Sequence, residues 1–248
     1  MLRIGVFSDP HGNLPALKAA LAYLEGAGCR EFLCCGDLVG VGPWPREVAA
    51  LLQSRGDIRC LAGNHDRYFD RCLAPPYPPR MEEGEAAHHR WVHSALTPAC
   101  RGWLRELPLS LTLQREGVCI SALHYPLDAA GEFAAPRPAP TAGDCRALFG
   151  HLPGQVVLCG HDHAGFAVAD GERLYLDPGS LGCPHGRGGI ARCGVLTLDR
   201  GRWQWQAAAT AYDLGEVRAA FARRRVPEGP ALLRDFYGLP PLLNQSHR

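Results

Sequence analysis

The stretch "LAGNHDRYFD", residues 61–70, places an Asn-His-Asp cluster directly behind a short apolar run. Gly, Asn and Asp are common turn residues, so a single loop of this kind carries little information. The same arrangement occurs three more times, in "IGVFSDPHGN" (4–13), "FLCCGDLVG" (32–40) and "VVLCGHDHAG" (156–165). Four polar clusters that each follow an apolar segment predict a shared structural role.

Strands and helices alternate in the first quarter of the chain. Apolar runs at 2–7, 31–36 and 58–63 predict three strands, and leucines at helical spacing between residues 14 and 24 predict a helix capped by Asn13. A second helix is predicted at 43–55. Parallel βαβ units carry functional groups on the loops at the carboxyl ends of their strands, so we expect the first three clusters to meet at one edge of a sheet.

The rest of the chain predicts a helical insertion, a return to strands and a helical end. A proline-rich connector and two helices, at 82–96 and 98–107, follow the third strand, and strands are predicted at 117–124, 155–161, 166–176 and 193–207. We therefore expect one α/β domain over residues 1–212, with an insertion at 71–107. The Arg-rich helical tail at 213–248 is expected to pack on the outside or on a partner, such as a second copy in a homodimer.

Composition excludes several classes of function. The net charge of +1 over 248 residues gives no support to bulk nucleic-acid binding. Lys18 is the only lysine and no GxxxxGK[ST] loop occurs, which excludes a P-loop. The eleven cysteines form no CxxC pair, which favours reduced, buried thiols in a cytoplasmic protein. Neither a signal peptide nor an apolar segment approaching the roughly 18 residues of a membrane span is visible.

The strand-end residues form a set of metal-ligating side chains: Asp9, His11, Asp37, Asn64, His65, His124, His161 and His163. Mixed imidazole and oxygen ligands suit Mn, Fe or Zn better than Mg or Ca, which favour oxygen alone. The set is too large for one tetrahedral ion, and no thiolate belongs to it. Two ions that share a bridging carboxylate would use all the ligands, as in hydrolytic two-metal sites.

These clusters have the order and spacing of a known family pattern. The chain contains "DPH" at 9–11, "GD" at 36–37, "GNHD" at 63–66, "LH" at 123–124 and "GHDH" at 160–163. From residue 1 to about 212 it resembles the calcineurin-like metallophosphoesterases, whose pattern is DxH, GD, GNH[DE], a lone His after a strand, and GHxH. The resemblance implies a metallophosphoesterase domain folded as a four-layer α/β/β/α sandwich of two mixed sheets, with the helical insertion as a lid.

The resemblance also implies a role for each site residue. It assigns a first ion to Asp9, His11 and His163, a second to Asn64, His124 and His161, and the bridge between them to Asp37. His65 would be the catalytic residue that faces the substrate, where it stabilises phosphoryl charge or protonates the leaving oxygen. The implied cofactors are two divalent ions, manganese before iron or zinc. The implied reaction is in-line attack of a metal-bridging hydroxide on phosphorus.

Departures from the pattern indicate which branch of the family the chain resembles. Protein Ser/Thr phosphatases have GDxVDRG and RGNHE, whereas this chain has Gly40 in place of the second Asp and Ala62 before "GNHD". "SDPHGNLPAL" and "DPGSLGCP" resemble the small bacterial and archaeal phosphodiesterase-like enzymes instead. We therefore expect a small phosphorylated or nucleotide substrate with a phosphodiester or nucleotide pyrophosphate bond. Tyr125 stands where relatives have Gly, and a bulky side chain there is expected to narrow the pocket.

Two other functions remain open alternatives. One is a phosphomonoesterase of small substrates. The other is a non-catalytic scaffold, like a eukaryotic retromer subunit that has this fold without the catalytic histidine; the presence of His65 and of every ligand argues against it.

Several polar residues near the motifs have simpler explanations. Asp66 fits a helix-capping or loop role at least as well as a catalytic one. His89 and His93 have a metal-compatible i, i+4 spacing, but without a carboxylate partner a solvated or lid-lining face is favoured over a third metal site. The role of His88 beside them is left open. The sequence assigns no substrate-binding residues.

Overall fold

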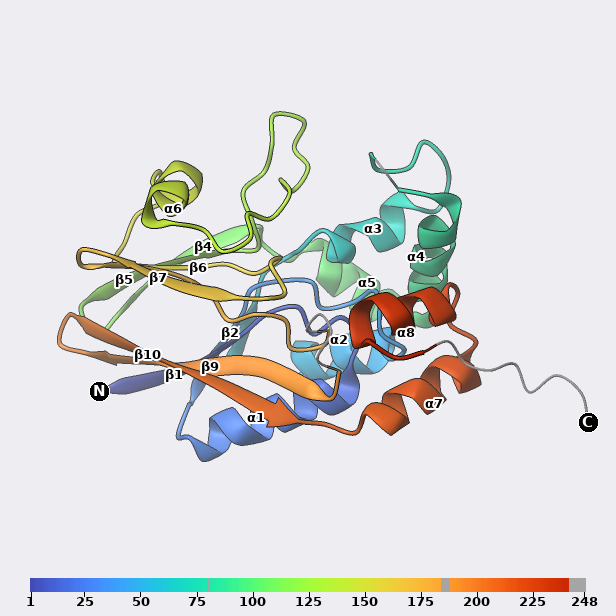
Figure 1. Cartoon of the computed structure of the whole chain (residues 1–248), viewed down its shortest axis with the longest axis horizontal. Helices are drawn as coiled ribbons and strands as arrows, with labels where there is room; N and C mark the ends of the chain where they lie inside the picture. The colour runs from blue at the N-terminus through green and yellow to red at the C-terminus, as the bar shows by residue number, and fades with distance from the viewer. Residues whose placement is uncertain (80, 184–187, 241–248) are drawn as a thin grey trace, which may run out of the picture.

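Two five-stranded sheets form the centre of the protein (Figure 1). The structure is a computed structural model, and it describes residues 1–79, 81–183 and 188–240. The first sheet consists of β10 (Arg202–Ala211), β9 (Ile190–Asp199), β1 (Leu2–Phe7), β2 (Glu31–Cys34) and β3 (Ile58–Cys60), in that order. The second consists of β4 (Ser110–Arg115), β5 (Val118–Leu123), β6 (Val156–Leu158), β8 (Arg173–Asp177) and β7 (Phe166–Asp170).

Both sheets are mixed. Strands β1, β2 and β3 run parallel and β9 and β10 antiparallel to their neighbours. In the second sheet β5, β6 and β8 run parallel, and the edge strands β4 and β7 are antiparallel. Alternate side chains of the two sheets, such as Ile4 and Val6 against Ile120 and Leu158, form one buried core between them.

Helices cover the outer faces of both sheets. Helices α1 (Leu14–Gly26) and α2 (Pro45–Gln53) lie outside the first sheet, where Leu17 and Leu24 share a buried cluster with Phe32. Helix α6 (Ala142–Phe149) lies outside the second sheet, with Phe149 packed among the side chains around Tyr175. The predicted four-layer α/β/β/α sandwich of two mixed sheets is confirmed.

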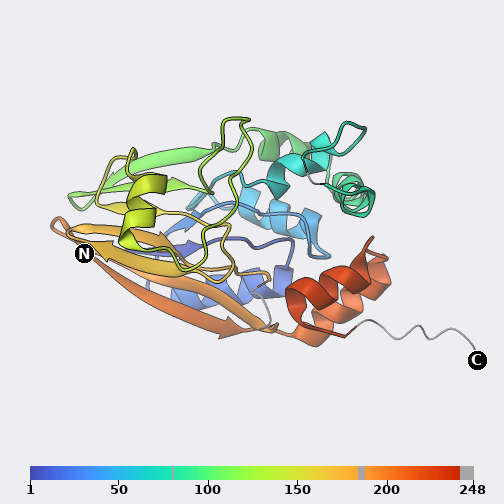
Figure 2. The same cartoon turned by 45° about the horizontal axis from the view of Figure 1, so that its top comes forward.

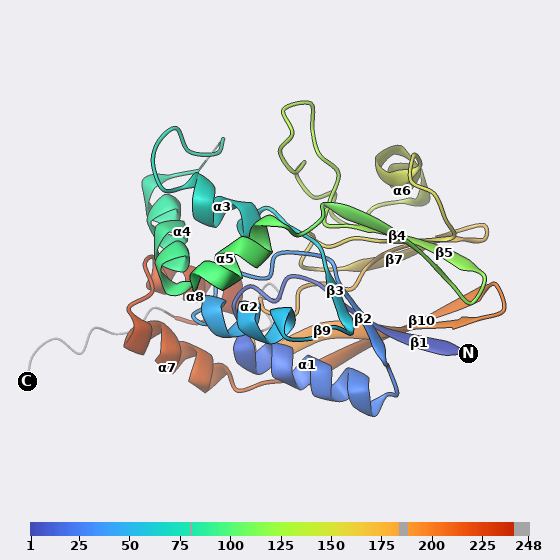
Figure 3. The same cartoon turned by 180° about the vertical axis from the view of Figure 1, so that it is seen from behind.

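The remaining helices gather at the end of the sheets where β1, β2 and β3 stop (Figure 2). Helices α4 (Glu83–Ala95) and α5 (Pro98–Arg105) lie within the insertion predicted at 71–107, and α5 packs against α2 (Figure 3). Helix α3 (His65–Arg71), which the sequence analysis did not predict, precedes them after β3. Helices α7 (Leu214–Arg224) and α8 (Gly229–Tyr237) pack on the chain itself, in a buried cluster with Val41, Trp44 and Cys183. The division of the chain at residue 212 stays a prediction, as does a partner for its C-terminal part.

None of the helices formed by the described residues combines the length and the apolar character needed to cross a membrane.

Asp66 joins two of the strand-end loops. Its carboxylate is only 2% exposed and accepts three backbone N–H groups: from Leu38 at 2.9 Å and Val39 at 3.1 Å on Oδ1, and from Gly63 at 3.0 Å on Oδ2. The loops after β2 and β3 are therefore held together by one buried side chain. This geometry supports the loop role over a catalytic one.

Replacing Asp66 by Ala should lower the free energy of unfolding by about 3 to 5 kcal/mol, because three buried N–H groups lose their acceptor. Urea denaturation of both proteins measures this difference. Asp128→Ala is the matched control: that carboxylate also accepts two backbone N–H groups, from Ala130 and Glu132, but lies in an exposed loop where water replaces it. Equal losses in the two variants would contradict the prediction.

Candidate metal centre

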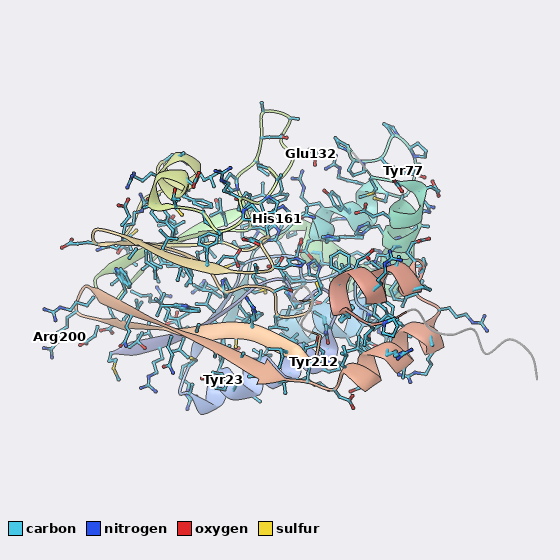
Figure 4. The ribbon with its side chains drawn as sticks, in the orientation of Figure 1. Tyr23, Tyr77, Glu132, His161, Arg200 and Tyr212 are labelled. Atoms are coloured by element: carbon cyan, nitrogen blue, oxygen red, sulfur yellow. The ribbon has the colours of Figure 1, made fainter. Side chains whose placement is uncertain are left out.

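The strand ends bring all eight predicted site residues into one place. Asp9 and His11 follow β1, Asp37 follows β2, Asn64 and His65 follow β3, His124 follows β5, and His161 and His163 follow β6. Figure 4 shows His161 near the middle of the molecule, below the loop that carries Glu132. Asp9, His11 and His124 have no exposed surface.

The first cluster of ligating atoms is formed by Asp9, His11, His163 and Asp37. Nε2 of His11 and Nε2 of His163 lie 3.1 Å apart. Oδ1 of Asp9 lies 3.5 Å from Nε2 of His163 and 3.7 Å from Nε2 of His11. Oδ2 of Asp37 also lies 3.7 Å from Nε2 of His11. Two imidazole nitrogens and two carboxylates thus converge on one point.

A second cluster shares the same Asp37 oxygen. Nε2 of His124 lies 3.1 Å from Oδ1 of Asn64, 3.2 Å from Nδ1 of His161 and 3.4 Å from Oδ2 of Asp37. The carboxylate of Asp37 therefore lies between the two clusters, which is the position required of a bridging ligand.

The hydrogen bonding of His124 shows that the second cluster fits a cation. Nδ1 of His124 lies 2.8 Å from the carbonyl oxygen of Cys35, which can only accept, so this nitrogen carries a proton. In the neutral ring Nε2 then has a lone pair that faces the oxygens of Asn64 and Asp37. Acceptor atoms that face one another in a buried site need a proton or a metal ion between them.

The charge balance agrees with this reading of the geometry. Burial lowers the pKa of His124, but the adjacent carboxylate of Asp37 raises it to about 9. Without a metal ion, a proton on Nε2 therefore supplies the positive charge at this position. Burial raises the pKa of the Asp37 carboxyl, but the surrounding imidazoles of His124 and His65 hold it well below its ordinary value. The site therefore keeps an ionised carboxylate at its centre.

The backbone at the site is strained. Asp9, His11, Asp37 and His161 have φ values of 53°, 45°, 54° and 76°, in the left-handed region that side chains disfavour. Val41, four residues beyond Asp37, has a φ of 56° as well. Each such residue costs on the order of 1–3 kcal/mol, and this strain typically collects at functional sites. Half of the predicted site residues carry it.

His65 contacts the first cluster, and one of its ring nitrogens lies within 4.8 Å of ligating atoms of His11 and Asp37, so these three residues could also hold a metal ion. The His65 ring is perpendicular to that of His11, with centroids 4.9 Å apart, and its backbone N–H donates to Oδ1 of Asp37 at 2.9 Å. Burial lowers the pKa of the His65 ring well below its ordinary value, although Asp37 opposes the shift. The ring is therefore neutral at pH 7. The individual roles assigned to the eight site residues stay predictions.

Comparison with known proteins identifies the family. The sequence model of the calcineurin-like phosphoesterase superfamily domain matches residues 2–201. The chain belongs to this superfamily. A curated relative, protein MJ0912 of Methanocaldococcus jannaschii, is 27% identical over 244 residues, which cover 91% of this chain and 94% of the relative.

Two solved structures share the fold of this calcineurin-like chain over nearly its whole length. The hypothetical protein PH1004 from Pyrococcus horikoshii OT3 has a TM-score of 0.82 and 19% identity, and the match covers 97% of this chain and 100% of that one. A metallophosphoesterase from Sphaerobacter thermophilus has a TM-score of 0.69 and 21% identity, with 96% and 99% covered.

Gly40 marks a departure from the protein-phosphatase branch of the superfamily, and the structure gives the physical reason. A Cβ atom at Gly40 would lie 2.7 Å from Nδ1 of His65, and the backbone there has a φ of 86°. The His65 ring thus occupies the space that an aspartate at position 40 would need. A carboxylate at residue 40 does not fit beside His65 in this arrangement.

Cys183 is a residue at the site that the sequence did not predict. Its Sγ lies 3.7 Å from Nδ1 of His163 and receives a hydrogen bond from Oγ of Ser180 at 3.6 Å. Burial raises the pKa of this thiol, but the charges of His11 and His163 lower it to about 6. Cys183, His11 and His163 together could also hold a metal ion, so the expectation of a site without a thiolate is open to test. The loop "DPGSLG" just before it was the available signal.

The structure also places the residues whose roles were open. The hydroxyl of Tyr125 accepts the backbone N–H of Arg137 at 2.8 Å, and its ring lies 5.3 Å from that of His161. The His93 ring stacks on Phe69, with centroids 6.1 Å apart. In the described part of the chain, neither His93 nor His89 belongs to a group that could hold a metal ion.

Replacing Gly63 by Ala should weaken Mn²⁺ binding by about 100-fold or more, since even partners outside the ligand shell contribute 10–100-fold. The added Cβ would lie 2.1 Å from Oδ1 and 2.6 Å from the backbone nitrogen of Asp37, so the bridging carboxylate must move. Isothermal titration with Mn²⁺ measures the loss. Gly102→Ala, where the Cβ meets nothing within 4 Å, should bind as the unaltered protein does.

Metal affinity should rise with pH up to about 9. In the ion-free protein the pKa of His124 is raised to about 9, so below that pH a bound ion must displace a proton. The apparent Mn²⁺ affinity should therefore fall by up to about tenfold per pH unit between pH 9 and pH 7. Titrations at pH 7, 8 and 9 check this, and a constant affinity across the range would contradict it.

Proposed function

We propose that this calcineurin-like chain is a dinuclear metal-dependent phosphohydrolase that cleaves a phosphodiester or nucleotide pyrophosphate bond. The observation that carries the proposal is the pair of ligand clusters that share Oδ2 of Asp37, 3.7 Å from Nε2 of His11 and 3.4 Å from Nε2 of His124. Hydrolytic two-metal sites are built around such a shared carboxylate.

The first ion would be held by Asp9, His11 and His163, the second by Asn64, His124 and His161, and both by Asp37. When bound, the ions acidify a water molecule and neutralise charge on the phosphate oxygens. The imidazole-rich ligand set suits Mn²⁺, with Fe and Zn as alternatives.

His65 acts on the substrate as a neutral ring. Its Nδ1 is enclosed against Gly40, so Nε2 is the nitrogen that reaches the substrate. Because the pKa of the ring lies well below its ordinary value, His65 at pH 7 serves as a hydrogen-bond donor to a phosphoryl oxygen. Of the two roles considered for the residue, we therefore propose charge stabilisation in preference to delivery of a proton.

Aromatic side chains lie beside both ligand clusters, which supports a substrate that carries an organic group on each side of the scissile phosphorus. The Phe133 ring lies 5.2 Å from that of His124, and the Phe236 ring lies 6.2 Å from that of His163. A phosphodiester or a nucleotide pyrophosphate extends to both sides of the scissile phosphorus, whereas a bare monoester extends to one. Apolar surface on both sides therefore favours the larger class.

The test is Mn²⁺-supplemented hydrolysis of bis(4-nitrophenyl) phosphate, 4-nitrophenyl phosphate and a dinucleoside polyphosphate. The first or the third should be cleaved faster than the second. His65→Ala should lower kcat by about 10²–10⁴-fold. Asp37→Asn should lower it by more than about 100-fold while the fold is retained, because the shared ligand loses its charge. Asp57→Asn, which alters a surface carboxylate paired with Arg55, is the matched control.

Each outcome has a distinct meaning. Cleavage of the monoester alone would replace the proposal with a phosphomonoesterase. Absence of hydrolysis in a protein that binds two Mn²⁺ ions would favour a scaffold. Full activity of Asp37→Asn would contradict the dinuclear site.

A further inference from the structure

Helix α4 of the insertion buries an imidazole ring without hydrogen-bonding it. His89 has no exposed surface, and neither of its ring nitrogens has a hydrogen-bond partner among the described residues. Glu85, one turn earlier on the same helix, has its Oε1 3.9 Å from Nε2, beyond hydrogen-bond range. An unpaired polar ring is destabilising in a core, where Leu or Phe would serve better. Its presence therefore calls for a reason other than packing alone.

The ring of His89 lies against the site. It is tilted by 42° to the ring of His65, with centroids 5.1 Å apart, and it meets Tyr68 edge-on at 5.3 Å. Tyr68 in turn contacts His65 at 5.6 Å, so the three rings form a closed triangle. The neighbouring His88 packs on Trp91, at 5.8 Å, and on His89, at 5.6 Å. His89 is thus the α4 residue whose ring contacts the ring of His65.

The orientation of His65 depends on packing. Its backbone is fixed by the hydrogen bond to Asp37, but Nδ1 has no hydrogen-bond partner in the described residues. Gly40 and His11 bound the ring on the side of the sheets, while Tyr68 and His89 bound it on the side of the insertion. Because no hydrogen bond fixes Nδ1, removal of the His89 ring would open space into which the His65 ring can turn about its χ torsions.

We propose that His89 is a positioning residue through which helix α4 holds the His65 ring in its substrate-facing orientation. The inference rests on the proposed function of His65. It assigns to the insertion a part in the reaction step itself, besides any part in covering the substrate.

The test compares His89→Ala, which removes the ring, with His89→Phe, which keeps a flat ring of similar size. In the Mn²⁺-loaded full chain, kcat for bis(4-nitrophenyl) phosphate should fall by about 10–100-fold in His89→Ala, since a displacement of about 1 Å can cost that much. KM and Mn²⁺ affinity should stay within about twofold, and His89→Phe should recover most of the loss. His93→Ala, one turn further along α4 and stacked on Phe69, is the matched control and should be unchanged.

A double substitution distinguishes positioning of the His65 ring from a general loosening of the structure around it. In the His65→Ala background, His89→Ala should cause no further loss, because the ring that it positions is absent. An equal loss in both backgrounds, a wild-type kcat in His89→Ala, or a failure of His89→Phe to recover activity would each overturn the inference. His89→Leu replaces His89→Ala in the series if the alanine variant does not fold.

A measurement independent of turnover keeps this inference separate from the proposed function. In the zinc-loaded, ¹⁵N-histidine-labelled full chain, the ring signals of His65 should move in His89→Ala and stay in place in His93→Ala. If the unaltered protein hydrolyses none of the phosphate esters, the proposed function fails, and the ring signals still decide whether His89 orients His65. Unmoved signals in His89→Ala would overturn the inference.

Discussion

The structure depends on an unfavourable meeting of lone pairs around the carboxylate of Asp37. Oδ2 of this residue faces imidazole nitrogens of His11 and His124, and Oδ1 receives the backbone N–H of His65. Bringing these groups together in a buried place is costly unless positive charge lies among them. The three N–H groups bound by Asp66 help to hold this arrangement in place and to enforce the strained backbone of Asp37.

Sequence alone predicted the parts of the molecule that follow from strand order. Every predicted ligand comes directly after an apolar strand, and parallel strands deliver their carboxyl ends to one edge whatever the details of packing. The gathering of Asp9, Asn64, His124 and His163 could be predicted for that reason, whereas the sandwich and the family were implied by the resemblance of five ordered motifs. Strand β4 was missed because it lies at an edge with half-exposed side chains, and helix α6 was missed although Thr141 and Asp144 form a capping box at its start.

The contacts of individual side chains could not be predicted from the sequence. The loop "DPGSLG" pointed to this region, but it does not indicate that Cys183 reaches His163, since this contact depends on how the loop after β8 folds over the loop after β1. His88 and His89 are neighbours of the same type, and only the rotation of α4 determines that one ring meets His65 and the other Trp91. Such outcomes depend on tertiary packing, which has no local pattern in the chain.

The packing of helices α7 and α8 links the end of the chain to the loop that carries Asp37. Val41, a β-branched residue in the left-handed region, lies with Trp44 in the buried cluster completed by Val217, Phe221 and Tyr237. Such a conformation persists only where surrounding structure enforces it. The family match ends at residue 201, yet the buried cluster that contains Val41 extends to Tyr237. A recombinant fragment trimmed to the matched range would lack β10 and would remove Val217, Phe221 and Tyr237 from the cluster around Val41 and Trp44, so biochemical work on this protein needs the C-terminal helices.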